Sequence, residues 1–332
     1  MGSITPGKIL VTGGGGFLGS AIVRQLVKNG GIVRSFSRGF YPELDKLNVE
    51  QIQGSIANMA DVENACRGIE LIFHTAAKAG VWGNYTEYYN TNTIGTLNII
   101  RACEKYGISR LIHTSSPSVI FNGTDMEGVD ESFPYPSEYP SHYSATKALA
   151  EHAVLRASKN GLRAIILRPH LIWGPGDNHL VPRIIDRYKS LRIVGGGKNR
   201  VDTIYIDNAA YAHILASEKL NTHPELSGKI YFISQNGPVF LWDMVNDILN
   251  AGGKPPVKKS ISISTARNIG TVLEFIYKTF RLKGEPKMTR FVAEELGTSH
   301  WFDTTAAKTD LGYQPKISTK EGLRRLKAWL GT

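Results

Sequence analysis

The stretch TGGGGFLG, residues 12–19, decides the fold of this chain. It follows a short apolar run and precedes a helical pattern, and Gly13, Gly16 and Gly19 are spaced Gly-x-x-Gly-x-x-Gly. Glycines at this spacing allow a tight turn, a close approach of backbone to a pyrophosphate and close packing of a helix on a sheet. The N-terminus of the following helix then faces the phosphates. The stretch predicts a dinucleotide-binding loop, for which a simple glycine-rich loop is the alternative.

Strands and helices alternate around this loop. The predicted strands cover residues 8–12, 32–38, 49–55, 70–77, 110–116 and 163–169. The predicted helices cover residues 17–28, 61–67, 91–106 and 143–158. This βαβα rhythm predicts an α/β fold with a doubly wound, mostly parallel sheet. In such sheets, ligands bind at the carboxyl ends of the strands.

The end of the second strand indicates which dinucleotide is bound. An acidic residue there would bind the ribose 2′-hydroxyl of NAD. This strand instead ends with Ser37 and Arg38, and the first acidic residue, Glu43, comes several positions later. Because a guanidinium pairs well with phosphate, these residues favour NADPH. The alternative is that Arg38 is a solvated loop residue and that NADH is used.

Composition limits the remaining classes. The chain has 332 residues, of which 42% are hydrophobic, and two cysteines. It contains no run of eighteen apolar residues and no secretory signal pattern, so we expect a cytoplasmic protein. Cys66 and Cys103 are far apart in the sequence. This spacing argues against a disulfide framework or a zinc site, and no metal is expected.

The net charge is +10, and the basic residues are mostly spread out except in the C-terminal third, where they recur from Lys254 to Lys327. Such a balance suits nucleic acid, an anionic membrane surface or anionic ligands. No aromatic residues are interleaved with these charges in a nucleic-acid pattern, so we expect no nucleic-acid partner. Contact with a membrane surface or with another enzyme through this third is the remaining interpretation, with a membrane-peripheral location as its consequence.

A second motif lies in SHYSATKALAE, residues 141–151. Tyr143 and Lys147 are four positions apart in a helical pattern and therefore share a helix face. An ammonium beside a phenol favours the phenolate and lowers the pKa of the phenol, which suits proton transfer. Taken alone, the pair is more simply read as two polar groups on a surface helix.

In this order, TGGGGFLG, Ser116 and Tyr143-x-x-x-Lys147 resemble the extended short-chain dehydrogenase/reductases. Further segments are similar to that family along almost the whole chain: HTAAKAG (74–80), NTIGTLNIIRAC (92–103), RPHLIWGPGD (168–177) and DLGYQP (310–315). The run IYIDNAAYAHILA (204–216) is similar to the 3β-hydroxysteroid dehydrogenase branch. TAAKAGVWG and TSSPSV are most similar to bacterial 2-alkyl-3-oxoalkanoate reductases of long-chain olefin biosynthesis.

The resemblance implies a Rossmann-type domain of residues 1–176, to which 203–234 return. It also implies a smaller substrate-binding part made mainly of residues 177–202 and 235–332. Catalysis would rest on Tyr143 as the acid, on Lys147 as its neighbour and ribose ligand, and on Ser116 as hydrogen-bond partner of the substrate oxygen. The predicted cofactor contacts are Gly13, Gly16, Phe17, Leu18, Gly19, Ser37, Arg38, Ser55, Ile56, Ala76, Ala77, Lys78, Asn92, Ser115, Tyr143, Lys147, Pro169 and His170.

Some of these positions carry further expectations. Ser55 stands where the family commonly has an aspartate that contacts adenine, which predicts weaker adenine binding. Asn92 either organises the helix near Lys147 or is a packing amide. Lys78 or His170 would bind a substrate carboxylate, with an exposed lysine as the alternative.

The substrate side is predicted more coarsely. Trp82, Tyr85 and Trp173 either wall an apolar pocket or are ordinary core and loop aromatics. The run at 266–284 is an amphipathic helix, which either covers the pocket or forms a basic surface toward a membrane or partner. The resemblance also implies a homodimer through the helices at 92–106 and 143–158.

The function that this resemblance implies is reduction of a 2-alkyl-3-oxoalkanoate, a hydrophobic acyl substrate, to the 2-alkyl-3-hydroxyalkanoate, with NADPH as the cofactor that Ser37 and Arg38 favour. A 3β-hydroxysteroid or sterol dehydrogenase is the first alternative. A nucleotide-sugar epimerase or dehydratase fits less well, because the dehydratases carry Asp-Glu where this chain has Pro117-Ser118. A cofactor-binding scaffold without turnover would typically lose the Tyr/Lys pair, which this chain keeps.

Overall fold

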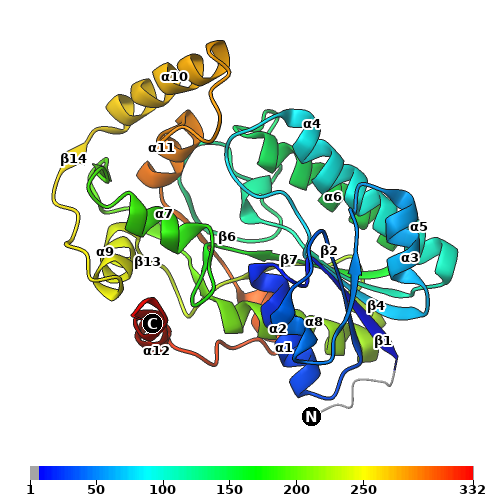
Figure 1. The fold of residues 1–332 in the computed structure, drawn as a ribbon. Coiled ribbons are helices and arrows are strands. Elements are labelled where there is room, and N and C mark those ends of the chain that lie inside the picture. Colours follow the sequence, from blue (N-terminus) through cyan, green and yellow to red (C-terminus); the bar gives the residue numbers. More distant parts are fainter. Residues whose placement is uncertain (1–6, 332) are drawn as a thin grey trace.

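The protein is described here by a computed structural model, which covers residues 7–331. A seven-stranded parallel sheet, in the order β12-β7-β5-β4-β1-β2-β3, forms its centre (Figure 1). Its strands are β1 (Lys8–Thr12), β2 (Val33–Ser37), β3 (Glu50–Gln53), β4 (Ile69–His74), β5 (Arg110–Thr114), β7 (Arg163–Pro169) and β12 (Ile230–Ile233). The doubly wound parallel sheet predicted from the sequence is therefore confirmed.

Helices cover both faces of this sheet, as Figure 1 shows. One face carries α1 (Phe17–Lys28) and α8 (Ile206–Thr222), and the other carries α3 (Met59–Cys66), α5 (Gly95–Tyr106) and α6 (His142–Lys159). Strand β1 shows why both faces must be covered. Ile9 and Val11 pack into the core on the α1 side, while Leu10 packs into the core on the α5 side. A strand buried on both faces is typical of parallel sheets.

Several shorter elements were not predicted from the sequence. The helix expected over 91–106 begins as a π-helix at Tyr89–Ile94 and becomes regular only at Gly95. The other short elements up to residue 240 are α2 (Pro42–Asp45), α4 (Tyr85–Tyr88), a 3₁₀ turn (Pro117–Val119), β6 (Met126–Val129), β8 (Ile172–Trp173), α7 (Leu180–Asp186), β9 (Ile193–Val194), β10 (Arg200–Val201), β11 (Ile204–Tyr205), a second 3₁₀ turn (Pro224–Leu226) and β13 (Val239–Phe240).

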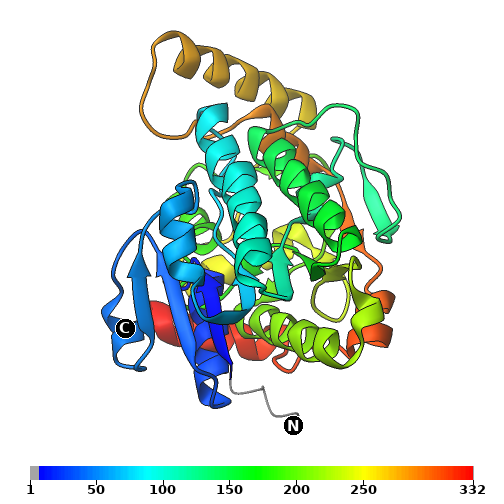
Figure 2. The same cartoon turned by 90° about the vertical axis from the view of Figure 1, so that its right-hand side faces the viewer.

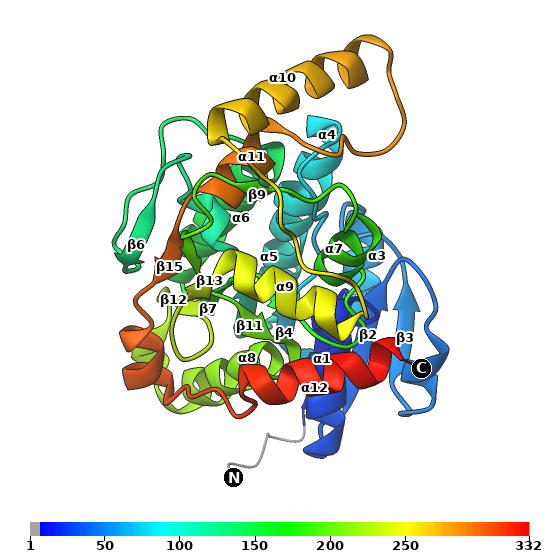
Figure 3. The same cartoon turned by 90° about the vertical axis from the view of Figure 1, so that its left-hand side faces the viewer.

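The remaining elements build a smaller unit beside the carboxyl ends of the main strands (Figure 3). It comprises α9 (Leu241–Ala251), β14 (Ser260–Ile261), α10 (Ile263–Thr279), α11 (Arg290–Gly297), β15 (His300–Phe302) and α12 (Thr319–Leu330). A second sheet runs β13-β10-β15-β6, so β6 from the first half of the chain pairs with β15 near its end. Conversely, α8 and β12 return to the main sheet.

The helix expected over 266–284 is present but shifted, since α10 covers Ile263–Thr279 and Phe280 is its C-cap residue. It lies at the periphery in both Figure 1 and Figure 2. Among residues 7–331, no helix is long and apolar enough to cross a membrane.

Candidate active site

The glycine loop has the geometry that a pyrophosphate requires. Gly13 has a φ of +68°, and a Cβ there would lie 3.0 Å from the Cα of Ala76. A Cβ on Gly19 would lie 2.1 Å from the carbonyl oxygen of Gly13, so only glycine lets α1 approach the loop. Gly16 is the N-cap residue of α1 and provides no side-chain cap, which leaves backbone N–H groups of the first turn available. These residues, with Phe17 and Leu18 opening the helix, fit a dinucleotide phosphate.

The edge of the sheet next to this loop holds the residues expected at the adenosine end. The Ser37 hydroxyl accepts a hydrogen bond from the Gly15 N–H at 3.2 Å. Arg38 follows it on the surface, and within residues 7–331 it has no ion-pair partner. The Ser55 N–H is bound by the carboxylate of Asp61 at 2.9 Å. The aspartate therefore fixes this turn from six positions later.

Ile56 follows Ser55 directly, and Ala76 and Ala77 come shortly after the end of β4. Ile56 is buried, its carbonyl accepts a hydrogen bond from Asn98, and a Cβ on Gly95 would lie 2.6 Å from its Cδ1. Ala76 donates its N–H to the Thr12 hydroxyl at 3.2 Å, so the ends of β4 and β1 are tied together. Ala77, one residue further on, is exposed.

Ser116 and Tyr143 come together as predicted. Ser116 is the N-cap residue of a short 3₁₀ turn, and its hydroxyl accepts hydrogen bonds from the N–H of Ser118 at 3.2 Å and from the Ser118 hydroxyl at 3.0 Å. Tyr143 stands in the first turn of α6, which Ser141 caps. Burial raises the pKa of Tyr143, and a hydrogen bond with Ser116 opposes that rise.

Lys147 lies one turn further along α6 and is 3% exposed. Its Nζ donates to the carbonyl of Thr114 at 2.5 Å. Burial lowers the pKa of Lys147 to about 8, and the carboxylate of Glu151 counteracts this. The pKa of Tyr143 is raised and not lowered as expected, because burial outweighs the influences that favour the phenolate.

A buried ion pair behind Lys147 was not predicted from the sequence. Glu151 and Arg168 are both fully buried, and the guanidinium binds the carboxylate at 2.5 and 3.1 Å. The Tyr135 hydroxyl donates to the same carboxylate at 2.5 Å. Burial acts to raise the pKa of Glu151, but Arg168 outweighs it and holds the pKa below its usual range. Two features of the sequence could have indicated this pair: Glu151 lies four positions after Lys147 on the same helix, and Arg168 is a charged residue near the end of an apolar strand.

Asn92 connects the loop after β4 to helix α6. It lies in the π-helical turn Tyr89–Ile94, a form that is frequent at functional sites. Its side-chain oxygen accepts from the Lys78 N–H at 2.7 Å, and its nitrogen donates to the Lys78 carbonyl and to the Thr146 hydroxyl. Because Thr146 immediately precedes Lys147, Asn92 ties the loop after β4 to the position of the lysine.

Lys78 and His170, the two groups expected to face a substrate carboxylate, have different surroundings. The Lys78 ammonium pairs with the exposed carboxylate of Glu87 at 2.9 Å. His170 is buried and shares a 2.7 Å hydrogen bond with His300. Burial lowers the pKa of His170 well below its ordinary value, and His300 lowers it further. His170 is therefore neutral, so the expectation of a cation at this position is wrong.

The other predicted site residues lie at the ends of β5 and β7. Ser115 is buried, and its hydroxyl is near enough to Glu151 to help lower the pKa of that carboxylate. Pro169 is the last residue of β7 and is followed by His170. Trp173, one of the three aromatics considered for the pocket wall, is fully buried and packs edge-on against Tyr205. It belongs to the core.

One titratable residue of α11 was also missed. Glu295 is only partly exposed, and burial raises its pKa to about 7. It is close enough to Tyr143 that its negative charge raises the pKa of the phenol. Glu295 is far from Tyr143 in sequence, and no local pattern marks it. Only the folding of the C-terminal unit over the site brings them together.

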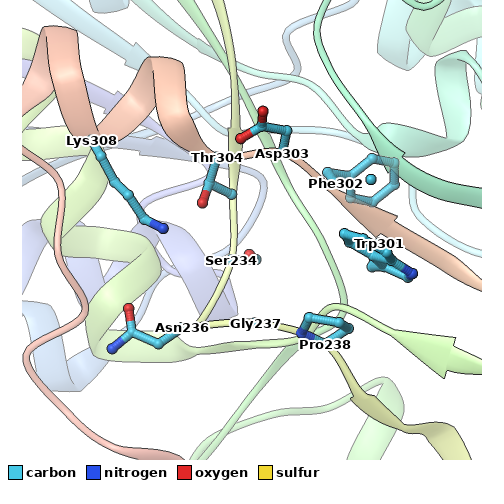
Figure 4. Close-up of a pocket in the computed structure, with 10 residues that line it drawn as sticks. Ser234, Asn236, Gly237, Pro238, Trp301, Phe302, Asp303, Thr304 and Lys308 are labelled. Carbon is cyan, nitrogen blue, oxygen red and sulfur yellow. The ribbon is translucent and has the colours of Figure 1, made fainter.

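A surface cavity of about 310 Å³ lies elsewhere, beside β15 (Figure 4). Ser234, Asn236, Asp303 and Lys308 are among the residues that line it. None of the predicted catalytic or cofactor-binding side chains reaches it. It is therefore not the site at which the Tyr143 phenol acts.

Comparison with known proteins agrees with this geometry. The 3-beta hydroxysteroid dehydrogenase/isomerase family matches residues 10–263. A 2-alkyl-3-oxoalkanoate reductase of Stenotrophomonas maltophilia is 50% identical over 97% of this chain and 98% of its own length. One from Shewanella oneidensis is 46% identical over 96% of this chain and 85% of its own. The sterol-4-alpha-carboxylate 3-dehydrogenase of Schizosaccharomyces pombe is 34% identical, with 96% of each chain covered.

Solved structures support the fold. The UDP-glucuronic acid 4-epimerase of Bacillus cereus, in complex with NAD, has a TM-score of 0.75 at 24% identity over 98% of each chain. The UDP-glucose 4-epimerase of Thermotoga maritima has the same TM-score at 23% identity, again with 98% of each chain covered. These likenesses concern the fold alone. The glycine loop, the Ser116–Tyr143–Lys147 geometry and the sequence relatives together show that this chain belongs to the 3-beta hydroxysteroid dehydrogenase/isomerase family of nicotinamide-dependent oxidoreductases.

Proposed function

We propose that the protein uses NADPH to reduce the ketone of a 2-alkyl-3-oxoalkanoate to the 2-alkyl-3-hydroxyalkanoate. The observation that carries this proposal is the 50% identity to a reductase of that name over nearly the full length of both chains. The sterol dehydrogenases are more distant, at 34% identity. The epimerases share the fold at still lower identity.

The chemistry follows from the catalytic side chains. When bound, the reduced nicotinamide supplies a hydride to the carbonyl carbon, and negative charge then builds on the oxygen. Ser116, fixed by Ser118, donates a hydrogen bond to that oxygen, and the Tyr143 hydroxyl transfers the proton that completes the alcohol. The ammonium of Lys147 stabilises the phenolate left behind. Thr114, Glu151 and Asn92 determine where that ammonium lies and whether it is charged.

We infer that the substrate carboxylate binds near Lys78. The Lys78 ammonium is at present paired with Glu87, whose side chain is 62% exposed. An exposed ion pair of this kind contributes little stability. A second carboxylate can therefore compete for the ammonium. Lys78→Ala should raise KM for the keto acid several-fold with little change in kcat. An unchanged KM would exclude Lys78 from substrate binding.

Ser37, the last residue of β2, and Arg38 directly after it favour NADPH, since the guanidinium has no ion-pair partner within residues 7–331 and can bind a 2′-phosphate. Arg38→Ala should weaken NADPH binding about tenfold and leave NADH binding nearly unchanged.

We assign dinucleotide binding to residues 1–176 and 203–234, and substrate binding mainly to 177–202 and 235–332. We also expect a homodimer through α5 and α6, which sedimentation would test.

The experiment that tests the proposed function follows the reduced-nicotinamide absorbance. Purified protein is mixed with NADPH or NADH and with long-chain 2-alkyl-3-keto acids or 3-ketosteroids. Oxidation of NADPH with the keto acids, abolished in Tyr143→Phe, would support the proposal. Turnover with steroids alone would move the chain to the sterol branch. No turnover with either class, together with tight dinucleotide binding, would overturn the substrate assignment and leave the fold intact.

A further inference from the structure

Helix α10 exposes large apolar side chains instead of burying them. Ala266 and Gly270 are the buried residues of this helix, whereas Phe275 and the adjoining Phe280 are each 68% exposed. The exposed apolar residues of the helix and the turn after it are Ile263, Ile269, Val272, Phe275, Phe280 and Leu282. Large exposed apolar groups gathered on one element mark an interaction site.

The packing of α10 explains which side is left outside. The helix lies on α11 through Gly270, where a Cβ would be 2.6 Å from the carbonyl carbon of Thr289. A contact this close uses small residues, so the large ones project elsewhere. Ile269, Val272 and Ile276 recur at intervals of three and four and share a helix face. Figure 1, Figure 2 and Figure 3 all place α10 at the outer margin of the molecule.

The α10 segment, defined as residues 258–290, is also strongly basic. It has eight lysines and arginines against Glu274 and Glu285, a net +6 of the chain's +10. Both glutamates are already paired, Glu274 with Arg290 at 3.0 Å and Glu285 with Arg183 at 2.9 Å. Within the described chain, Lys283 and Lys287 have no ion-pair partner. The segment therefore presents excess positive charge next to its apolar face.

We propose that the α10 segment docks on an anionic lipid surface. Apolar residues flanked by lysine and arginine are the composition of helices that lie in the membrane interface, where anionic headgroups attract the cations. A second copy of the chain would bring two segments of like charge together, which costs free energy. Charge complementarity thus selects the lipid surface over self-association.

The segment also contacts the loop at the predicted substrate side. Tyr277 meets Trp82 edge-on at 6.3 Å, and the Lys278 ammonium lies 5.8 Å from the centre of the same indole. Burial lowers the pKa of His142, the neighbour of Tyr143, and the nearby Lys278 ammonium lowers it further. A bilayer under α10 would thus lie beside the loop that carries Trp82. The inference goes beyond the proposed reaction, because docking needs neither substrate nor dinucleotide.

Vesicle flotation tests the proposal with the full-length protein. The probes are phosphatidylcholine vesicles with and without phosphatidylglycerol, at low and high salt. The wild type should float with the anionic vesicles only, and salt should release it. Phe275→Ser and Lys283→Glu/Lys287→Glu should each reduce the bound fraction about tenfold. The matched controls are Ile32→Ser, which also alters a mostly exposed residue, and Lys320→Glu/Lys327→Glu, which makes the same charge change on α12.

Three outcomes would overturn the proposal: no flotation of the wild type at low salt, equal loss in the control variants, or a dimer that Phe275→Ser dissociates while vesicles are ignored. The last would assign the apolar face to a second copy. Because flotation is measured without keto acid or NADPH, vesicle binding without turnover would leave this proposal standing and the reaction overturned. Turnover of the keto acid without vesicle binding would overturn the docking proposal and leave the proposed reaction standing.

Discussion

Helices α6 and α10 have nearly the same length, 18 and 17 residues, but bury opposite kinds of side chain. Helix α6 places Thr146, Lys147 and Glu151 in the interior and leaves Leu149 41% exposed. Helix α10 leaves Val272 and Phe275 outside and buries only two small residues.

Burying charged side chains in α6 and exposing apolar side chains on α10 both cost free energy, which other interactions must offset. In α6, the buried charges are held by Arg168, Tyr135 and the Thr114 carbonyl, because an unpaired buried charge is strongly unfavourable. In α10, the exposed apolar groups have no such compensation within the described chain. The difference teaches that a departure from simple amphipathic patterning can mark function in two ways. The buried charges of α6 serve the proposed reaction inside the fold, and the exposed apolar side chains of α10 serve the proposed contact with a lipid surface.

The largest effect is expected from removing Tyr143, the proposed proton donor on α6. Tyr143→Phe should lower kcat/KM about a thousandfold, equivalent to about 4 kcal/mol, because general acid catalysis contributes on this scale. The measurement is NADPH oxidation with keto acid. Dinucleotide binding, followed by fluorescence titration, should stay within about twofold. Loss of dinucleotide binding as well would mean that the substitution disturbed the dinucleotide site and not only the acid.

Breaking the buried pair behind Lys147 should reduce stability most. Arg168→Ala leaves the Glu151 carboxylate buried without its partner, and we expect a loss of about 3–5 kcal/mol in the free energy of unfolding. Urea denaturation measures it. The control Arg324→Ala removes an exposed pair on α12 and should cost less than about 0.5 kcal/mol. Similar losses at both positions would contradict the contrast between interior and surface.

Glu151 should also set the pH range of activity. Lys147 carries its charge below its pKa of about 8, and Glu151 raises that pKa. Glu151→Gln should therefore lower the pKa of Lys147, and activity at alkaline pH should be lost about one pH unit earlier than in the wild type. A kcat–pH profile shows the shift. Tyr135→Phe, which changes a neutral neighbour of the carboxylate, should leave the alkaline limb in place, and a uniform loss in Glu151→Gln would indicate a structural role only.

Glu295 should impose a weaker pH dependence from the α11 side. Its pKa of about 7 means that it is neutral below that pH and negative above it, where it repels an anionic substrate. KM for the keto acid should rise a few-fold as the pH increases through 7. In Glu295→Gln this rise should disappear, because the amide does not titrate. A rise that persists in the variant would show that another group causes it.

The smallest effect on stability is expected on α10. Phe275→Ser should change the free energy of unfolding by less than about 0.5 kcal/mol, because the side chain is already exposed. Phe291→Ser on neighbouring α11 replaces a ring that is 5% exposed and should cost several kcal/mol. Thermal unfolding distinguishes them. A large loss in Phe275→Ser would show that its ring packs on the fold, which would remove the contrast between the two helices.

Local patterns predicted most of the sheet and its helices. The strand at 8–12, the helix at 17–28 and the strand at 163–169 have the bounds expected from their apolar runs and flanking residues. The π-helical turn Tyr89–Ile94 was not predicted, because its residues have an ordinary helical pattern and only the contacts of Asn92 distinguish it. The pairing of β6 with β15 joins residues more than 170 positions apart, and no local signal encodes it.

By itself, the sequence determined the glycine loop before α1 and the Tyr143–Lys147 pair on α6, because glycine spacing and helical periodicity act over a few residues. The tertiary structure decided the electrostatics. It brought Arg168 to Glu151, left His170 neutral against His300, placed Glu295 beside Tyr143 and raised the pKa of that phenol where a lowering was expected. The reason is physical: a pKa depends on burial and on charges near in space, and elements distant in sequence supply both.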